Sequence, residues 1–169
     1  MIILLMGIEG SGKTTVGRLL AARLQYEFAD ADDFHSAANK EKMSRGIPLN
    51  DADRGPWLAA IRDQMARWIA AEKNGVITCS ALKQSYRDIL LSASGSADKQ
   101  TGEIKIVYLR GTYSLLASRL HSRTGHFASE SLLASQFATL EEPHGVVTVD
   151  VDPSPSQIVD QVVQQLHLP

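Results

Sequence analysis

The first seventeen residues constrain the fold of this chain more than any other stretch. Residues 1–6 form a continuous apolar run, which is too short to span a membrane and is typical of a strand buried on both faces. From Gly7 to Thr14 the sequence fits G-x-x-x-x-G-K-[ST] at every fixed position. Apolar residues then recur at helical spacing. The stretch therefore predicts a strand, a phosphate-binding loop and a helix, in that order.

The residue types of this loop indicate a nucleotide. Glycines allow positive φ, so that backbone N–H groups converge on an anion at a helix N-terminus. Lys13 can reach the β- and γ-phosphates, and the Thr14 hydroxyl is placed to ligate Mg²⁺. A Gly-rich turn with an exposed lysine is the simpler alternative, but the complete motif favours a site for a nucleoside triphosphate with magnesium. The predicted nucleotide-binding residues here are Gly7, Ile8, Glu9, Gly10, Ser11, Gly12, Lys13, Thr14 and Thr15.

Length and composition indicate one globular domain. A chain of 169 residues suits a single domain with one good core. The formal net charge of −2 argues against general nucleic-acid affinity, which normally appears as a basic surface. The lone cysteine permits no internal disulfide and fits a reducing cytoplasm. No stretch predicts a signal peptide or a membrane span, so we expect a cytoplasmic protein that does not act on membranes.

Strands and helices alternate along the whole chain. Further strands are expected at residues 28–30, 76–79, 104–109 and 146–149. Helices are expected after Ser36, from about Pro56, after Ser80, at about 112–123 and 130–140, and after Ser154. This alternation predicts an α/β fold, a five-stranded parallel sheet flanked by helices. The polar clusters at 30–35, 80–87 and 110–111 all follow strands, so they should meet the phosphate-binding loop at one sheet edge.

Two other classes of P-loop protein are not favoured. A guanine-binding GTPase needs N-K-x-D after a strand, whereas residues 39–42 read N-K-E-K within a predicted helix. An ATPase motor usually carries an apolar strand ending in Asp, whereas the third strand here ends in Cys79 and Ser80. What remains is a single kinase domain over residues 1–169 of the nucleoside-monophosphate-kinase type, with a short helical lid at about 120–138.

The ordered motifs resemble a more specific family. They read G-I-E-G-S-G-K-T, F-A-D-A-D-D-F-H, L-N-D-A-D-R-G-P-W, C-S-A-L-K-Q-S-Y-R, S-R-L-H-S-R-T-G-H-F and Q-F-A-T-L-E-E-P. Together they closely resemble the gluconokinases from residue 2 to about residue 152. The third and fourth motifs are far more discriminating than the P-loop. The resemblance implies transfer of the ATP γ-phosphate to the 6-hydroxyl of D-gluconate, with Mg²⁺, in a protein whose relatives are often homodimers.

Basic residues after the third strand suit an anionic acceptor. Lys83 and Arg87 lie four apart, so on a helix they share a face, where like charges repel each other by about 0.2–0.5 kcal/mol. A bound carboxylate would offset that repulsion, although two solvated surface cations are the simpler alternative. Arg54 could pair with a neighbouring aspartate, and the resemblance assigns it to the substrate instead.

Three aspartates compete for the role of catalytic base: Asp30, Asp32 and Asp33. Phosphoryl transfer to a hydroxyl needs a carboxylate that orients the hydroxyl and accepts its proton. The resemblance selects Asp32, as base or as ligand to Mg²⁺ through water, while helix capping is the alternative. His35 is implied as a donor to gluconate hydroxyls.

The predicted lid carries two arginines at helical spacing, Arg119 and Arg123. They suit a lid that closes on ATP and stabilises charge on the transferred group, although a solvated basic face is the alternative. The resemblance further implies substrate contacts from His126 and Gln136, and adenine contacts from Arg119 and Asp152.

Two other functions stay open at this point. A related small-metabolite kinase, such as one acting on shikimate, also uses acids after its second strand and arginines for a carboxylate. The third and fourth motifs argue against it. A regulator that binds ATP without turnover is the alternative from another class, and the complete set of catalytic residue types argues against that.

Overall fold

The computed structural model describes residues 1–95, 103–122 and 127–169. Its strands are β1 (Ile2–Met6), β2 (Glu27–Asp30), β3 (Gly75–Thr78), β4 (Ile104–Arg110) and β5 (Val147–Asp150). Its α-helices are α1 (Lys13–Leu24), α2 (Ala37–Ser44), α3 (Asp51–Ala70), α4 (Gln84–Leu91), α5 (Tyr113–Ser122), α6 (Phe127–Thr139) and α7 (Pro155–Gln165). The described residues also form two short 3-10 helices, η1 (Ala31–Phe34) and η2 (Ser92–Ser94).

The five strands form one parallel sheet in the order β2-β3-β1-β4-β5. Strand β1 lies in the centre, with Ile2 opposite Gly75 of β3 on one side and Ile104 of β4 on the other. Every residue of β1 has an exposed fraction of 0%, because strands cover both of its edges and helices cover both of its faces. The predicted fold class and the predicted buried first strand are confirmed.

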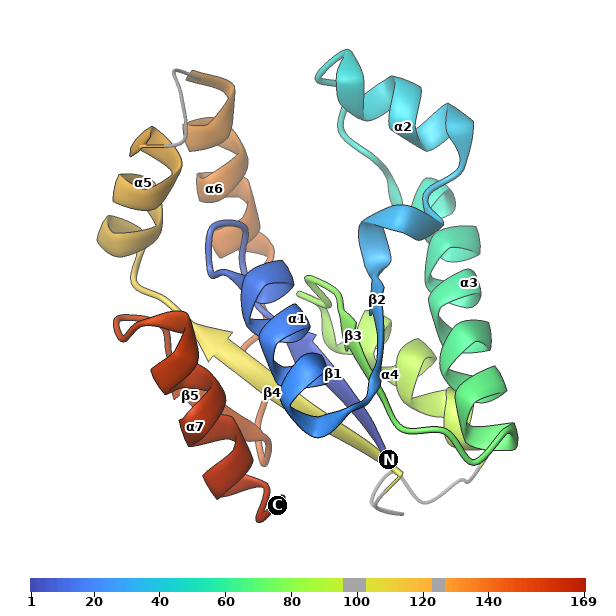
Figure 1. Cartoon of the computed structure of the whole chain (residues 1–169). Helices are drawn as coiled ribbons and strands as arrows, with labels where there is room; N and C mark the ends of the chain where they lie inside the picture. Colours follow the sequence, from blue (N-terminus) through green and yellow to red (C-terminus); the bar gives the residue numbers. More distant parts are fainter. Residues whose placement is uncertain (96–102, 123–126) are drawn as a thin grey trace.

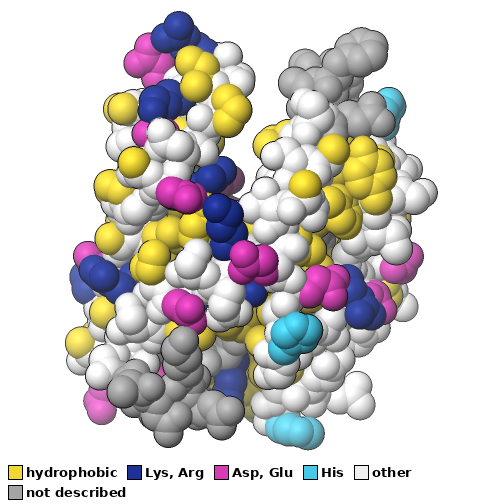
Figure 2. Space-filling model, turned by 180° about the vertical axis from the view of Figure 1, so that it is seen from behind, with side chains coloured by type: hydrophobic (Ala, Val, Ile, Leu, Met, Phe, Trp, Pro, Cys, Tyr) yellow, Lys and Arg dark blue, Asp and Glu magenta, His cyan; other side chains and the backbone are white. Residues whose placement is uncertain are grey.

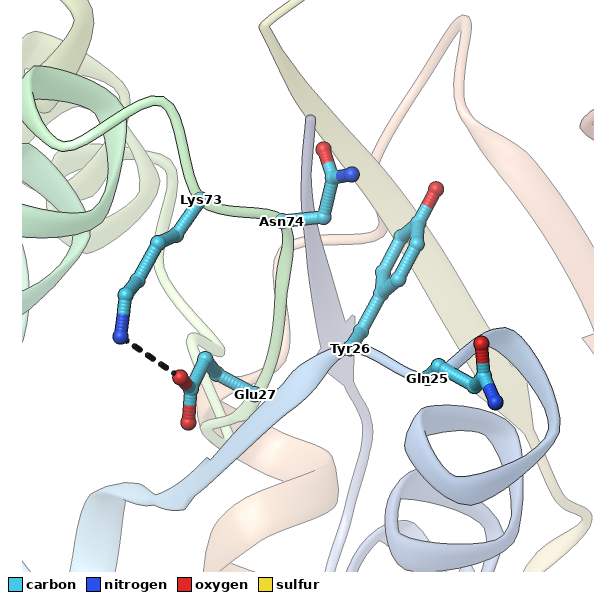
Figure 3. Close-up of a pocket in the computed structure, with 5 residues that line it drawn as sticks. All are labelled: Gln25, Tyr26, Glu27, Lys73 and Asn74. Atoms are coloured by element: carbon cyan, nitrogen blue, oxygen red, sulfur yellow. Dashed lines mark hydrogen bonds and ion pairs between the residues drawn. The ribbon is translucent and has the colours of Figure 1, made fainter.

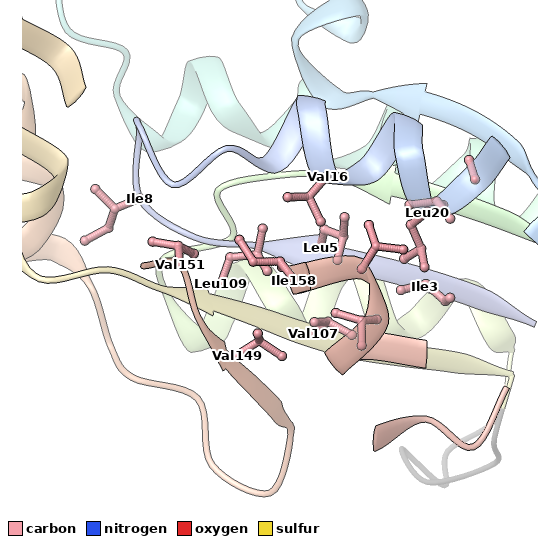
Figure 4. Close-up of a cluster of buried hydrophobic side chains, with 14 of the residues drawn as sticks. Ile3, Leu5, Ile8, Val16, Leu20, Val107, Leu109, Val149, Val151 and Ile158 are labelled. Atoms are coloured by element: carbon pink, nitrogen blue, oxygen red, sulfur yellow. The ribbon is translucent and has the colours of Figure 1, made fainter. Parts of the chain in front are cut away.

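Two hydrophobic clusters lie between the sheet and the helices that cover its faces, and Figure 1 shows how these helices are arranged around the sheet. On one face, Ile3 and Leu5 of β1 pack with Val16 and Leu20 of α1 and with Ile158 of α7 (Figure 4). On the other face the alternate β1 residues pack with side chains of α3 and α4. Because both clusters fix β1, the loop that leaves its carboxyl end starts from a rigid support.

Helix α3 begins earlier than the sequence predicted. Asn50 caps it, since Asn50 Oδ1 accepts from the N–H of Asp53 at 2.8 Å while Asp53 Oδ2 accepts from the N–H of Asn50 at 3.1 Å. Pro56 therefore lies inside the helix, and the prediction that it occupies the first turn is wrong. The capping box outweighs the proline signal. As a result Arg54 lies on a helix and not in a loop.

Other predicted helix ends are confirmed. The Ser36 hydroxyl caps α2, and Gly46 follows that helix with φ +68°. Ser154 and Gln157 form the predicted capping box of α7, with Pro155 as its first residue. Among the described residues, no helix is long and apolar enough to cross a membrane.

Two helical arms rise beyond the carboxyl ends of the strands. In Figure 1, α2 stands on one side of the loop after β1, and α5 with α6 stands on the other. The space-filling view from behind shows a hollow between two columns of the molecule, with acidic and basic side chains along it (Figure 2). The predicted site residues come from the elements around this hollow.

Candidate active site

The P-loop, residues 7–14, leaves the carboxyl end of central strand β1. Gly12 has φ +87° and directly precedes α1, a conformation that other residues rarely adopt. A Cβ at Gly7 would lie 2.7 Å from the carbonyl oxygen of Leu109 on neighbouring β4, so only glycine fits there. The loop therefore turns tightly and opens the N-terminus of α1, which favours an anion.

Two polar side chains of the P-loop bond other groups of the protein, and a third has no hydrogen-bond partner among the described residues. Lys13 is partly buried, which lowers the pKa of its ammonium group, and its Nζ donates to the carbonyl of Ile8 at 3.2 Å. Thr14 Oγ1 donates to Asp30 Oδ2 at 2.7 Å. The fully buried hydroxyl of Ser11 has no hydrogen-bond partner among the described residues. A phosphate above the loop would satisfy Ser11 and draw Lys13 outward.

Asp30 and Asp32 take different places at the end of β2. Asp30 bonds Thr14 and also accepts the N–H of Asp32 at 3.1 Å, which caps η1. Asp32 is exposed, yet desolvation and then the neighbouring Asp30 raise the pKa of its carboxyl, against the attraction of Lys13. Asp30 was a candidate for the base but was not predicted to contact Thr14, although its position as the last residue of the strand could have indicated that contact.

The oxygen donors of Thr14 and Asp30 fit Mg²⁺. Magnesium prefers hard oxygen ligands and usually takes only one or two from protein, completing its shell with water and phosphate. The described residues hold no cluster of three or more His, Cys, Asp or Glu side chains that could bind a metal by itself. A magnesium ion that arrives with a nucleotide is consistent with both observations.

Trp57 fixes the turn that carries Asp32. Its indole Nε1 donates to the carbonyl of Ala31 at 2.7 Å, and its ring stacks on His35 with centroids 4.4 Å apart and planes 9° apart. The backbone N–H of His35 in turn donates to the backbone carbonyl of Asp32 at 3.4 Å. Burial lowers the pKa of His35, and its Nδ1 has no partner among the described residues. Both ends of η1 are therefore held, and His35 keeps a polar atom for a ligand.

Arg54 and Lys83 come together from α3 and the start of α4. Their cationic groups lie 5.9 and 5.4 Å from the ring centroid of Tyr86, and both approach Asp51 Oδ1, at 4.0 and 3.5 Å. About a third of each side chain is exposed. We call Asp51, Arg54, Lys83 and Tyr86 the acceptor group. Asp51 and Tyr86 were not predicted, although both lie in the motifs that carry the family resemblance.

Arg87 does not share a helix face with Lys83, so that prediction is wrong. Helix α4 begins at Gln84, and Lys83 precedes it in an extended conformation. Arg87 is 2% exposed and donates to the carbonyls of Ala81, Leu82 and Glu141 at 2.9–3.1 Å. Its guanidinium therefore holds the loop before α4 against the segment after α6.

The α5–α6 arm contacts the P-loop directly. Gln136 Oε1 accepts the backbone N–H of Glu9 at 2.8 Å, and a Cβ at Gly10 would lie 3.3 Å from Leu120 Cγ. Arg119 donates to the carbonyl of Val151. Arg123 and His126, which were predicted to bind ligand, lie outside the described residues.

A cavity of about 380 Å³ lies at the carboxyl ends of β4 and β5. Asp152 and Gly111 line it together with Thr112 and Phe137. Because Arg119 donates to the carbonyl of Val151, which precedes Asp152, the two residues predicted to contact adenine lie close together in the structure. The cavity shares the sheet edge with the P-loop.

Comparison with known proteins gives the family. The chain is 42% identical over 178 residues to a probable gluconokinase of Mus musculus, covering 98% of this chain and 97% of that protein. It is 39% identical to the thermosensitive gluconokinase of Escherichia coli, over 95% of this chain and 84% of that protein. The chain belongs to the gluconokinase family. The predicted resemblance is confirmed along nearly the full chain.

Solved structures agree with this family. A gluconokinase from Sinorhizobium meliloti superposes with a TM-score of 0.85 at 43% identity, over 98% of this chain and 90% of that one. The family model described as Shikimate kinase matches residues 9–167. A shikimate kinase from Aquifex aeolicus shares only the fold, with a TM-score of 0.59 at 15% identity. The gluconokinase family therefore lies within a wider group of small-molecule kinases that share this sheet.

Proposed function

We propose that the protein transfers the γ-phosphate of ATP to the 6-hydroxyl of D-gluconate. Its membership of the gluconokinase family supports this activity. The observation that carries the proposal is the acceptor group. Two cations already share one carboxylate oxygen within 4.0 Å, on the same sheet edge as the P-loop. The carboxylate of D-gluconate would bind the same two cations beside Asp51.

The P-loop binds the phosphates in this proposal. The N–H groups at the start of α1 and the Lys13 ammonium hold the β- and γ-phosphates, and Ser11 gains the partner that it lacks. Thr14 and Asp30 supply oxygen ligands, directly or through water, to magnesium. When bound, Mg²⁺ supplies positive charge to the phosphate oxygens.

Asp32 is the proposed base. Its raised pKa moves the carboxyl toward the range in which a base can both be ionised near neutral pH and accept a proton well. His35 donates to an acceptor hydroxyl from a ring that Trp57 fixes. Arg54 and Lys83 hold the acceptor carboxylate at the other end, so the hydroxyl at C6 points toward the P-loop.

The α5–α6 arm is the proposed lid, over about residues 120–138. Arg119 and Arg123 stabilise charge on the transferred group as the lid closes, and His126 and Gln136 approach the substrate. The adenine lies near Arg119 and Asp152. The contact of Gln136 with the P-loop supports a closing motion that ends on this loop.

The protein is proposed to be a cytoplasmic homodimer with one kinase domain in each chain. Its single, buried cysteine supports a reducing compartment. Light scattering of the purified protein across a concentration series tests the dimer, since a constant mass of about one chain would contradict it.

An assay of ADP release tests the activity. The acceptors are D-gluconate, other aldonates, shikimate, free hexoses and nucleoside monophosphates, with a blank that lacks acceptor. Rapid turnover with D-gluconate alone is expected. Preference for shikimate would favour the second candidate, which the match to the family model makes worth including. ATP binding without turnover on any acceptor would favour a regulator and contradict the proposal.

A further inference from the structure

Asp51 lies at the centre of the acceptor group. Tyr86 OH donates to Asp51 Oδ1 at 2.6 Å, Lys83 Nζ lies 3.5 Å from the same oxygen, and Arg54 Nη1 lies 4.0 Å from it. The hydrogen bond from Tyr86, followed by the charge of Lys83, holds the pKa of Asp51 below its usual value. Asp51 is therefore ionised at neutral pH and offsets one of the two cations.

Two further ionisable groups near Arg54 add no net charge beside it. Asp53, the other acid near Arg54, pairs with Lys42 Nζ at 2.7 and 2.9 Å. His35, which also faces Arg54, has a lowered pKa and is neutral at neutral pH. Arg54, Lys83 and Asp51 together thus leave one net positive charge for the acceptor. That charge equals and opposes the charge of one carboxylate.

We propose that Asp51 determines the charge specificity of the acceptor site, because its negative charge weakens the binding of a dianion, such as a phosphonate or phosphate ester, more than the binding of a monoanionic carboxylate. This inference rests on the proposed function. Without Asp51 the site would hold two net positive charges. Because Coulomb energy scales with the product of the charges, the change favours a dianion twice as much, in free energy, as a monoanion.

Two other roles for Asp51 make different predictions. As the first residue of α3, its carboxylate could act only on the helix dipole, and its loss would then change stability but not specificity. As a direct partner of substrate hydroxyls, it would strengthen binding of every polyol, whatever its charge. A ligand series of different charge separates these roles from the proposed one.

The experiment compares three ligands with matched hydroxyls at saturating Mg-ATP. They are neutral D-glucitol, monoanionic D-gluconate and the analogue of D-gluconate in which a dianionic phosphonate replaces the carboxylate. The KM of D-gluconate and the inhibition constants of the other two are measured in the wild type, in Asp51→Asn and in Asp63→Asn. The control Asp63→Asn removes the same charge from an exposed site on α3, about 18 Å from Asp51 along the helix axis.

For Asp51→Asn we expect the KM of D-gluconate to fall about threefold and the inhibition constant of the phosphonate about tenfold. The constant for D-glucitol should not change, and Asp63→Asn should match the wild type throughout. Tyr86→Phe keeps the charge of Asp51 but frees its carboxylate, so it should shift the preference in the same direction by about twofold.

Weaker binding of all three ligands by Asp51→Asn would assign Asp51 to the hydroxyls and overturn the inference. An unchanged ratio between phosphonate and D-gluconate would also overturn it and leave only the helix dipole. Failure of the proposed function is a separate result, since the wild type would then release no ADP with D-gluconate.

Discussion

The two ends of the sheet carry cavities of similar size but of different chemistry. The cavity at the amino end has a volume of about 360 Å³, and that at the carboxyl end about 380 Å³. Glu27, Lys73 and Asn74 line the first, together with two residues that follow α1 (Figure 3). Cavity volume alone would not tell which end binds a ligand.

Three of the polar residues at the amino end, Glu27, Lys73 and Asn74, have partners from nearby residues. Lys73 Nζ contacts Glu27 Oε1 at 2.8 Å, the N–H of Glu27 donates to the carbonyl of Asn74 at 3.0 Å, and the Met1 ammonium donates to the Asn74 side chain. At the carboxyl end lie the buried side-chain atoms that lack partners among the described residues, from Glu9, Ser11 and His35. Unsatisfied polar groups, and not open volume, therefore distinguish the functional end.

The largest effect is expected from Asp32→Asn, which removes the proposed base. The kcat for D-gluconate should fall by about 10²–10⁴, because an amide cannot accept the proton of the hydroxyl. Steady-state kinetics at saturating ATP and D-gluconate measures this loss. Activity within threefold of the wild type would show that Asp32 is not the base.

Stability provides the control for that variant. Folding raises the pKa of Asp32, so the native state disfavours its ionised form, and this cost is complete above the raised pKa. Asp32→Asn should therefore be at least as stable as the wild type at pH 7. The advantage should disappear as the pH falls below the pKa of the unfolded chain, which thermal unfolding from pH 3 to pH 7 would measure.

A smaller effect is expected from Lys83→Ala. One of two cations for the acceptor carboxylate is lost, so the KM of D-gluconate should rise about 10- to 100-fold while kcat changes little. The KM of ATP should stay within twofold, because the P-loop is intact. An equal rise in both KM values would indicate a general change of structure instead.

Trp57→Phe should act through the turn that carries Asp32. Phenylalanine can still stack on His35 but cannot donate to the carbonyl of Ala31. We therefore expect kcat to fall about fivefold, and the KM of D-gluconate to rise by a smaller factor. Trp68→Phe is the matched control. Trp68 lies on the same helix but packs against Gly75 at the start of β3, and its change should lower stability without lowering kcat.

The smallest effect is expected from Lys73→Ala at the amino end. About half of each partner in its ion pair is exposed, so the free energy of unfolding should fall by less than about 1 kcal/mol. Activity should match the wild type. A large loss of activity would show that the amino end of the sheet also contributes to function, which would contradict the difference between the two ends.

Much of the fold could be predicted from local patterns. The run of apolar residues before the P-loop and the alternation of strands and helices determine a parallel sheet, and the residues that follow its strands meet at one edge. The start of α3 was misjudged because the side chains of Asn50 and Asp53 bond each other across the cap, which a single proline signal does not reveal.

The site was harder to predict where partners come from distant segments. Arg87 looked like a ligand for substrate because its partners were unknown, and one of them, the carbonyl of Glu141, lies 54 residues away. The sequence offered a neighbouring aspartate as a partner of Arg54, but it did not reveal that Tyr86 from another helix donates to Asp51. The spacing of residues predicts which side of a helix they share, but whether a side chain is buried depends on contacts from distant segments of the chain.

Arg87 anchors the base of the α5–α6 arm. The guanidinium binds the backbone just after α6 and the loop before α4 at once, and the Glu141 carboxylate also accepts the N–H of Gln84 at 2.6 Å. The root of the arm is thereby tied to the loop that carries Lys83. If the proposed lid closes over the P-loop, this tie predicts that the arm turns about Glu141 and that Lys83 keeps its place beside the acceptor.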